Sequence, residues 1–323
     1  MRIAIIGASH WHAPLYYKPA LRLSGVDIVG VSDPDALAAQ RVGAALDVPA
    51  HTDYRELITE EKPDFTFVFG RHCDLAEIGA WMIARKAPML LEKPGGMNAT
   101  QVAALRDQAA ANGTYVTIGF NFLVSDMLQK IQAVAAEEKV TFCSFRYIGG
   151  GPYRYRESGC SWMLDPALSG GGSTINLSVH FFDMFRRLTG STPTDVTALM
   201  GNHSWGLPIE DFSSVVLRSP EAMCTVETGY AFPAETGVFD VAFSIRTTRS
   251  YIVVRADDCM EIHRLTDGAV TRIPVTPRNA PWYPLFTQDC IDRFARDRPP
   301  IATLDDLTEA MKIVDAAYAA GRL

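Results

Sequence analysis

Three polar side chains could act together on one substrate, although they lie far apart in the sequence. Lys93 follows a predicted strand in Glu92-Lys93-Pro94, and its ammonium could hold an alkoxide or carbonyl oxygen by a charge-assisted hydrogen bond. Asn176 and His180 are spaced i to i+4 on a predicted helix, so they share one face of it. Since histidine titrates near neutral pH, His180 could accept a hydroxyl proton. Lys93, Asn176 and His180 are therefore candidate catalytic residues and candidate substrate contacts.

Each candidate also has a structural interpretation. A lysine beside a turn is usually a surface residue, and a histidine on a helix rich in Leu, Val and Phe is usually a hydrogen-bonded core residue. Gly170-Gly171-Gly172 precedes the Asn176 helix, and such glycines suit close approach of the backbone to a ligand at a helix N-terminus. The glycines favour the functional interpretation of His180.

The N-terminal segment contains a candidate phosphate-binding turn. Gly7 follows the first predicted strand and precedes a helix, as in the G-x-G-x-x-G pattern of dinucleotide-binding domains. Ser9 and His12 replace the second and third glycines of that pattern. The Ser9 hydroxyl could hydrogen-bond a pyrophosphate oxygen, and His10 and Trp11 lie in the same turn. Gly7, Ser9, His10 and Trp11 are candidate cofactor-binding residues.

Asp33 ends the second predicted strand, where a ribose-binding acid is expected after such a turn. Its carboxylate could accept hydrogen bonds from the ribose hydroxyls and would repel a 2′-phosphate. The sequence therefore predicts NAD as the cofactor and disfavours NADP. The alternative is that Asp33-Pro34-Asp35 is only a helix-capping turn.

Three more residues follow predicted strands at the same sheet edge. Arg71 and His72 come after the strand at 64–69, and Glu92 comes after the strand at 88–91. Because cofactors lie at the carboxyl ends of parallel strands, we expect Arg71, His72 and Glu92, together with Lys93, to contact the dinucleotide. For Arg71 and His72 the alternative is a solvated loop in which Asp74 caps the next helix.

A glycine-rich segment at 149–157 combines aromatic and basic side chains, namely Tyr153, Arg154, Tyr155 and Arg156. Aromatic rings stack on sugars, and arginines bind carboxylates in a bidentate manner. The segment is interpreted as a substrate lid, with Tyr153 and Arg156 as substrate contacts and an acidic sugar derivative as one candidate ligand. The alternative is a solvent-exposed loop.

In the first third of the chain, alternating strands and helices are expected to position the candidate residues from Gly7 to Lys93. Short apolar runs at 2–6, 27–32, 64–69, 88–91 and 115–118 predict strands, and longer patterns at 14–23, 35–46, 74–86 and 98–112 predict helices. This alternation indicates βαβ units around a parallel sheet. Asn98 is expected to cap the last of these helices, and Gly113 is expected to end it.

After about residue 120 the pattern changes to consecutive strands, at 140–147, 194–200, 211–217, 223–230, 238–246 and 249–254. A helix at 174–188 interrupts them, and helices at 285–296 and 305–320 end the chain. The predicted fold class is α/β plus α+β. A doubly wound parallel sheet in a dinucleotide-binding domain at 1–119 precedes a large, mostly antiparallel open sheet in a substrate-binding and oligomerisation domain at 120–323, and the C-terminal helices could pack back on the first domain.

Composition excludes several classes of partner. The chain has 323 residues with a net charge of −7 and a pI near 5.5, which argues against nucleic acid because phosphate binding needs clustered Lys and Arg. The apolar runs are too short to span a membrane. The six cysteines are scattered and contain no Cys-x-x-Cys pair, so we expect no metal site and a reducing, cytoplasmic location.

Taken together, the motifs resemble one family over nearly the whole length, the glucose-fructose oxidoreductase, inositol dehydrogenase and rhizopine-catabolism (Gfo/Idh/MocA) oxidoreductases. The residues that carry the resemblance are Gly7, Val29 to Asp33, Tyr54 to Leu57, Lys62 to Asp64, Glu92-Lys93-Pro94, Trp162 to Pro166, Gly170 to Gly172, Asn176, His180, Asp183 and Glu210 to Phe212.

The resemblance implies a Rossmann domain, a second domain that packs in homodimers or homotetramers, and NAD(P)-linked oxidation or reduction of sugars and polyols. It also implies that Lys93 and His180 are catalytic and that a cis peptide precedes Pro94. Asn176 departs from the family, because polyol dehydrogenases of this family usually carry an aspartate there. An asparagine can orient the histidine ring or a substrate hydroxyl, but it cannot stabilise an imidazolium by charge.

The sequence therefore predicts an NAD(P)-dependent dehydrogenase or reductase that acts on CH–OH groups of a sugar, polyol or hydroxy/keto acid. Two alternatives stay open. One is an NAD-binding sensor without catalysis, and the other is an NAD-assisted sugar lyase or glycosidase without net redox change.

Overall fold

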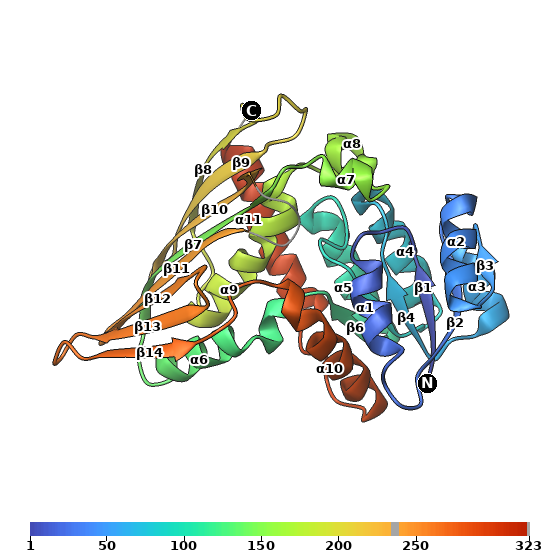
Figure 1. Ribbon diagram of the computed structural model, residues 1–323, viewed down its shortest axis with the longest axis horizontal. Coiled ribbons are helices and arrows are strands. Elements are labelled where there is room, and N and C mark those ends of the chain that lie inside the picture. The colour runs from blue at the N-terminus through green and yellow to red at the C-terminus, as the bar shows by residue number, and fades with distance from the viewer. Residues whose placement is uncertain (234–238, 322–323) are drawn as a thin grey trace.

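The computed structural model describes residues 1–233 and 239–321 and arranges them around two β-sheets (Figure 1). The first sheet has six parallel strands in the order β3-β2-β1-β4-β5-β6, which confirms the predicted doubly wound sheet. Its strands are β1 (Arg2–Ile6), β2 (Asp27–Ser32), β3 (Ala50–His51), β4 (Phe65–Val68), β5 (Met89–Leu91) and β6 (Val116–Ile118).

Helices cover both faces of this sheet. They are α1 (Ala13–Ala20), α2 (Ala36–Leu46), α3 (Tyr54–Glu61), α4 (His72–Ala84) and α5 (Ala99–Asn112). Apolar side chains of α1 and α2 pack on one face, and those of α3, α4 and α5 pack on the other. Helix α5 begins and ends as expected, because the Asn98 side chain accepts from the Gln101 N–H at 3.0 Å and Gly113 has a φ of 62°. The short elements β3 and α3 were not expected.

The second sheet has eight strands in the order β14-β13-β12-β11-β7-β10-β9-β8. Strands β7 and β10 run parallel, and the other described neighbours run antiparallel, which confirms the prediction of a mostly antiparallel sheet. The strands are β7 (Val140–Gly150), β8 (Asp195–Gly201), β9 (Phe212–Arg218), β10 (Met223–Phe232), β11 (Asp240–Thr247), β12 (Ser250–Arg255), β13 (Cys259–Arg264) and β14 (Val270–Pro274). Residue 238, where one expected strand begins, lies outside the described residues.

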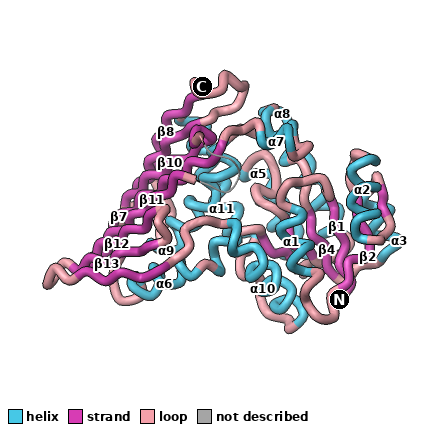
Figure 2. The backbone as a smooth tube through the Cα atoms, viewed as in Figure 1, coloured by secondary structure: helices cyan, strands magenta, loops and turns pink. Residues whose placement is uncertain are grey.

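Within the described chain, helices lie against one face of this second sheet and leave the other face open (Figures 1 and 2). The helices of this half are α6 (Asp126–Ala135), α7 (Arg154–Glu157), α8 (Pro166–Ser169), α9 (Val179–Thr189), α10 (Tyr283–Ala295) and α11 (Leu304–Ala320). Side chains along β11 alternate accordingly, and Val241, Phe243 and Ile245 are buried under the helices.

The last two helices connect the two halves of the molecule. Helix α10 packs on α1, and α11 packs on both α5 and α9. Tyr16 and Phe286 share one apolar cluster with the first sheet, with ring centroids 6.3 Å apart. This packing fixes α9 relative to the carboxyl ends of the first sheet, where the candidate site lies.

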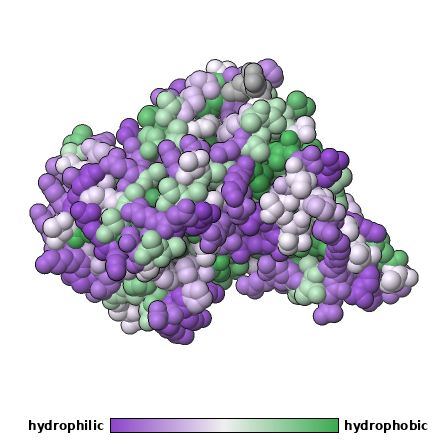
Figure 3. Space-filling model, turned by 180° about the vertical axis from the view of Figure 1, so that it is seen from behind, coloured by the Kyte–Doolittle hydropathy of each residue, from purple (hydrophilic) through white to green (hydrophobic). Residues whose placement is uncertain are grey.

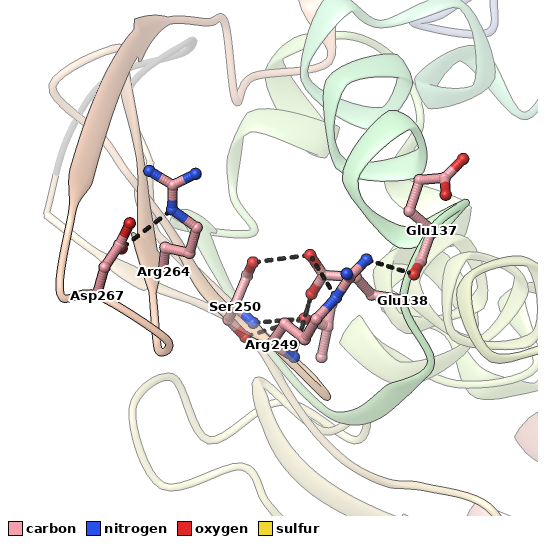
Figure 4. A network of polar contacts seen from close by, with 7 residues as sticks. Glu137, Glu138, Arg249, Ser250, Arg264 and Asp267 are labelled. Atoms are coloured by element: carbon pink, nitrogen blue, oxygen red, sulfur yellow. Dashed lines mark hydrogen bonds and ion pairs between the residues drawn. The ribbon is translucent and has the colours of Figure 1, made fainter.

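A polar network ties the connection between α6 and β7 to the turn between β11 and β12 (Figure 4). The Glu138 carboxylate accepts from the Ser250 hydroxyl at 3.0 Å and from the Arg249 N–H at 3.2 Å. The Arg249 guanidinium also donates to the Glu137 carbonyl oxygen at 2.8 Å. The network stabilises one end of the second sheet, and its residues line neither of the two cavities of the candidate site.

The surface seen from behind is mostly hydrophilic, with apolar residues in small groups between polar ones (Figure 3). Among the described helices, none is both long and apolar enough to cross a membrane.

Candidate active site

Two cavities open near the turn at residues 7–12. The first has a volume of about 560 Å³ and lies at the carboxyl ends of β1, β2 and β4. Its lining includes Gly7, Ser9, His10, Asp33, Pro34, Arg71, Asp74 and Trp162. The second has a volume of about 180 Å³, and its lining includes Trp11, His12, Lys93, Tyr147, Arg154, Tyr155, Asn176, His180, Asn279 and Tyr283. The turn therefore contributes residues to both cavities.

Gly7 allows the backbone of the turn to approach strand β4 closely. Its φ is +74°, and a Cβ atom at this position would lie 2.5 Å from the Phe69 carbonyl oxygen. A side chain would therefore clash with the backbone at Phe69. This close-packed turn is the cradle that a dinucleotide pyrophosphate needs.

Asp33 is buried and faces the same turn. Its carboxylate accepts from the Ser9 N–H at 2.8 Å and from the Asp35 N–H at 3.0 Å, one bond to each oxygen. Each carboxylate oxygen can accept a second hydrogen bond, so ribose hydroxyls have acceptors at this point of the lining. The residues of the first cavity thus fit a dinucleotide.

The other predicted cofactor contacts do not all line the first cavity. His10 lines the first cavity and stacks on Trp11 with ring centroids 3.9 Å apart. Arg71 also lines it and pairs with Asp74 at 2.6 Å. His72 is buried outside the lining of both cavities, and its Nδ1 lies 2.6 Å from the Ser169 carbonyl oxygen. Trp11 lines the second cavity instead.

Lys93 and Asn176 are in direct contact in the second cavity. The Lys93 ammonium donates to the Asn176 side-chain oxygen at 2.7 Å and to its backbone oxygen at 2.8 Å. The peptide bond between Lys93 and Pro94 is cis, as the resemblance implied. Burial lowers the pKa of Lys93 to about 8, because desolvation disfavours the ammonium, while the charge of Glu92 raises it.

Two tyrosines hold the Asn176 amide. Its Nδ2 donates to the Tyr155 hydroxyl at 2.8 Å and to the Tyr230 hydroxyl at 2.9 Å. The residue lies in a π-helical turn, Thr174–Ser178, that runs directly into α9, so the expected helix at 174–188 is present with a wider first turn. The amide is therefore fully engaged, and its orientation fixes the Lys93 ammonium.

His180 lies on α9 at the edge of the same cavity. Its ring makes edge contacts with Phe120 and Phe122, with centroids 5.5 Å and 5.7 Å away. Its Nδ1 has no hydrogen-bond partner among the described residues. Burial, together with the charge of Lys93, lowers the pKa of His180 well below its ordinary value, so the ring is neutral and can accept a proton.

A second histidine, His12, reaches this cavity, and the sequence interpretation missed its role. Its Nδ1 lies 3.0 Å from a Glu92 carboxylate oxygen, and the other oxygen of Glu92 accepts from the Tyr16 hydroxyl at 3.1 Å. Burial raises the pKa of Glu92 to about 7.

The sequence did contain a signal for His12, because this residue, like Lys93, follows a strand at the carboxyl edge of the sheet. Glu92 orients His12 and lies outside the lining of the first cavity.

The three glycines before Asn176 contact protein rather than an open ligand site, which corrects our interpretation. A Cβ at Gly171 would lie 2.0 Å from the Tyr318 hydroxyl, and one at Gly172 would lie 2.0 Å from the Glu210 backbone oxygen. The Glu210 carboxylate accepts from the Gly172 and Thr174 N–H groups at 2.8 Å and 2.9 Å. The helix N-terminus is thus already occupied by a buried carboxylate of the same chain.

In the segment at 149–157, Arg154 and Tyr155 line the second cavity, while Tyr153 and Arg156 do not. Tyr153 is 38% exposed and packs edge-on against Trp205, and the Arg156 guanidinium lies 4.8 Å from the centre of the Tyr153 ring. The structure does not bring Tyr153 and Arg156 together with Lys93, and their contact with a substrate stays a prediction.

Among the described residues, no group of three or more His, Cys, Asp or Glu is arranged to hold a metal ion. Asp183 lies on α9 three residues after His180, and its carboxylate pairs with the Arg187 guanidinium at 2.7 Å. Arg187 also lies on α9 and pairs with Asp306 of α11 at 2.9 Å, so Asp183 belongs to a network that links α9 to α11.

Comparison with known proteins identifies both halves of the chain. Residues 1–120 match the model of an oxidoreductase family with an NAD-binding Rossmann fold, and residues 138–253 match the Gfo/Idh/MocA C-terminal domain. The rhizopine catabolism protein MocA of Rhizobium meliloti is 26% identical over 201 residues. That alignment spans 60% of this chain and 59% of the relative.

Solved structures share the fold over nearly the full length. An oxidoreductase from Agrobacterium radiobacter in complex with NAD⁺, L-tartaric acid and magnesium has a TM-score of 0.86 at 17% identity, covering 99% of this chain and 96% of that one. An inositol dehydrogenase homologue from Azotobacter vinelandii with NAD⁺ has a TM-score of 0.84 at 15% identity, covering 99% and 95%. Levoglucosan dehydrogenase with NADH and levoglucosan has a TM-score of 0.82 at 15% identity, covering 99% and 96%.

The two family models, the relative and the cradle at Gly7 agree on one assignment. The chain belongs to the Gfo/Idh/MocA family of oxidoreductases and carries its NAD-binding Rossmann domain.

Proposed function

We propose that this protein is an NAD-dependent oxidoreductase that interconverts the CH–OH and C=O groups of a small sugar, polyol or hydroxy/keto acid. The observation that carries the proposal is that Lys93, Asn176 and His180 line one small cavity, which shares the turn at 7–12 with the dinucleotide cavity. NAD, when bound, supplies the hydride acceptor for the oxidation. The first cavity holds the dinucleotide through the Gly7 turn and the Asp33 carboxylate.

Lys93 binds the reacting oxygen in this proposal. Its ammonium has three donors, of which two are used by Asn176, so one is left for a substrate hydroxyl or carbonyl. Because the site is buried, a charge-assisted hydrogen bond from Lys93 stabilises a developing alkoxide more strongly there than the same bond would in water. Asn176 is the positioning residue, since both of its oxygen atoms hold Lys93.

His180 accepts the hydroxyl proton during oxidation. The ring is neutral and lines the cavity, and proton transfer to it gives an imidazolium and leaves the substrate oxygen as part of the carbonyl product. In the reduction the same proton returns to the oxygen. The phenylalanines beside the ring exclude water from this transfer.

The size of the second cavity limits the substrate. At about 180 Å³ it is smaller than the roughly 300 Å³ at which cavities for drug-sized ligands begin. A monosaccharide or a small hydroxy acid fits this size. Levoglucosan and L-tartaric acid in the related structures are compounds of the same scale.

We also propose that the chain forms a homodimer or homotetramer through the open face of the second sheet. Helices cover only the opposite face of this sheet in the described chain (Figure 1). The open face carries half-buried, small side chains at its centre, including Ser144, Thr225 and Ser244. A sheet face with small side chains at its centre, and with its neighbouring charges paired within the chain as Arg146 is with Glu227 and Asp240, suits a self-complementary interface.

The proposal is tested by following NADH absorbance with a panel of monosaccharides, polyols, sugar acids and hydroxy acids, and by identifying the products. We expect net NADH formation with at least one compound and a matching carbonyl product. Product formation without net NADH would instead support a lyase or glycosidase. NAD binding by calorimetry without turnover of any compound would support a sensor, and no NAD binding at millimolar concentration would refute the proposal.

A further inference from the structure

The lining of the second cavity carries positive charge, although the protein as a whole has a net charge of −7. Lys93 and Arg154 both line it, together with His12 and His180, and none of its described lining residues is Asp or Glu. The adjacent carboxylate of Glu92 lies behind His12, and both of its oxygens are already hydrogen-bonded within the protein. Two cations therefore face a small cavity without an acidic residue in its described lining.

Arg154 is held in place by uncharged groups. Its guanidinium donates to the Gly150 carbonyl oxygen at 2.9 Å and to the Tyr155 hydroxyl at 3.1 Å. It also lies 5.0 Å and 5.5 Å from the centres of the Tyr155 and Tyr230 rings. Aromatic faces stabilise a cation without neutralising it, so the side chain is positioned while its charge is kept.

The guanidinium has unused capacity for a ligand. Of its five N–H donors, two are used within the described chain, which leaves three for other acceptors. No carboxylate of the described residues forms an ion pair with Arg154, whereas Arg146 on β7, the preceding strand, pairs with both Glu227 and Asp240. A planar fork with free donors matches the geometry of a carboxylate.

The two cations divide the cavity into two functional ends. Lys93 contacts Asn176, and Asn176 contacts Tyr155, whose hydroxyl also accepts from Arg154. This chain of hydrogen bonds places the guanidinium beyond the residues that would hold the reacting oxygen. A substrate that reaches both ends carries its oxidisable CH–OH group at Lys93 and an acceptor group at Arg154.

We propose that the substrate carries a carboxylate and that Arg154 binds it, so that the protein acts on sugar acids or small hydroxy acids rather than on neutral sugars or polyols. This inference rests on the proposed function of the same cavity. The planar guanidinium fork matches a planar carboxylate, and the phosphate ester of a sugar is the competing acceptor that the test includes.

The test uses pairs of compounds that differ in the carboxylate, and it measures binding rather than turnover. Calorimetric titrations in the presence of NADH, which cannot accept a hydride from the compounds, compare D-glucuronate with D-glucose, D-galacturonate with D-galactose, and D-gluconate with D-glucitol, and add glucose 6-phosphate. We expect at least one acid to bind about tenfold or more tightly than its neutral partner, the range for a hydrogen bond to a charged group.

Two variants connect that preference to one side chain. Arg154→Gln should lose the preference for the acid, and Arg154→Lys should recover only part of it, because lysine keeps the charge but lacks the planar fork. The matched control is Arg85→Gln, since Arg85 also lies on an aromatic ring, 3.6 Å from the centre of Trp81, and donates to a backbone oxygen, but lies outside both cavities. The control should keep the preference.

Three results would overturn the inference. They are equal or tighter binding of the neutral compounds, tighter binding of glucose 6-phosphate than of every acid, and an unchanged preference in folded Arg154→Gln. If the acid preference is present but no compound yields NADH, the proposed function fails and the assignment of Arg154 stands. If neutral sugars yield NADH and bind as well as acids, the proposed function stands and this inference fails.

Discussion

At the level of single side chains, the site depends on charges that are buried next to one another. Glu92 and Lys93 are neighbours in the chain, and burial raises the pKa of Glu92 to about 7 and lowers that of Lys93 to about 8. Glu92 therefore has two roles in this arrangement. It orients His12 by a hydrogen bond, and its charge keeps Lys93 protonated at a higher pH than burial alone would allow.

This coupling gives a pH dependence. In the proposed reaction Lys93 binds the reacting oxygen as an ammonium, so kcat/KM should fall as the pH rises through about 8. In Glu92→Gln the charge that raises the Lys93 pKa is absent, so the alkaline fall should move to lower pH. Glu309→Gln, a carboxylate that pairs with Lys312 on α11, serves as the control and should leave the fall unchanged. An alkaline fall that stays in place or moves upward in Glu92→Gln contradicts this role.

At the level of elements, the π-helical turn at the start of α9 is the feature that positions Asn176, and Glu210 holds that turn. The Glu210 side chain is 1% exposed and accepts hydrogen bonds from two backbone N–H groups and from the Tyr318 hydroxyl. The charge also lies at the positive end of the helix. One carboxylate thus connects the catalytic turn to α11.

Removal of Glu210 should therefore destabilise the protein. Glu210→Ala leaves three buried donors without their acceptor, and we expect the free energy of unfolding to fall by about 2–4 kcal/mol. Tyr318→Phe removes one of the three donors together with its hydrogen bonds and should cost about 1 kcal/mol. Urea denaturation of the two variants and the wild type measures both values. A change below about 0.5 kcal/mol in Glu210→Ala would show that Glu210 does not hold the turn.

Most elements could be predicted from the sequence, but the contacts between them could not. Strands with buried, regularly alternating side chains such as β11 are visible in the pattern, whereas β14 has no fully buried side chain and shows no alternation. The strand end at Lys93 and the helix spacing of Asn176 and His180 were visible in the sequence, whereas their meeting in one site was expected only from the family resemblance. The contact partners of Gly171 and Gly172, and the Tyr230 ring beside Arg154, come from residues distant in the chain, so local spacing carried no signal for them.

At the level of the whole molecule, α10 and α11 hold the two sheets together, and the second sheet keeps one face open (Figure 1). The division of the chain at about residue 119 stays a prediction. On the open face, Ser144 lies opposite Ser244 on β11 and Thr225 on β10, at the centre of the sheet. A second copy of the chain on this face would cover these small side chains.

The oligomeric state is accessible to light scattering after size-exclusion chromatography. We expect the wild type to have two or four times the chain mass of 35.5 kDa and Ser244→Arg to shift to the single-chain mass, because the variant places an unpaired charge in the interface. Thermal unfolding of the variant should stay cooperative, since Ser244 lies on the open face of the sheet. A wild-type mass of one chain, or an unchanged mass in Ser244→Arg, contradicts the proposed interface.

The most direct test of the account is a comparison of Lys93→Met with the wild type, with NADH formation and NAD affinity measured on the same samples. We expect Lys93→Met to lower kcat about 10²–10³-fold, as loss of an oxyanion-binding donor does, while NAD binds within about threefold of wild type. Lys312→Met, on the surface of α11, should leave both values unchanged. Turnover by Lys93→Met at the wild-type rate would contradict the assignment of the cavity at Lys93 as the site of the reaction.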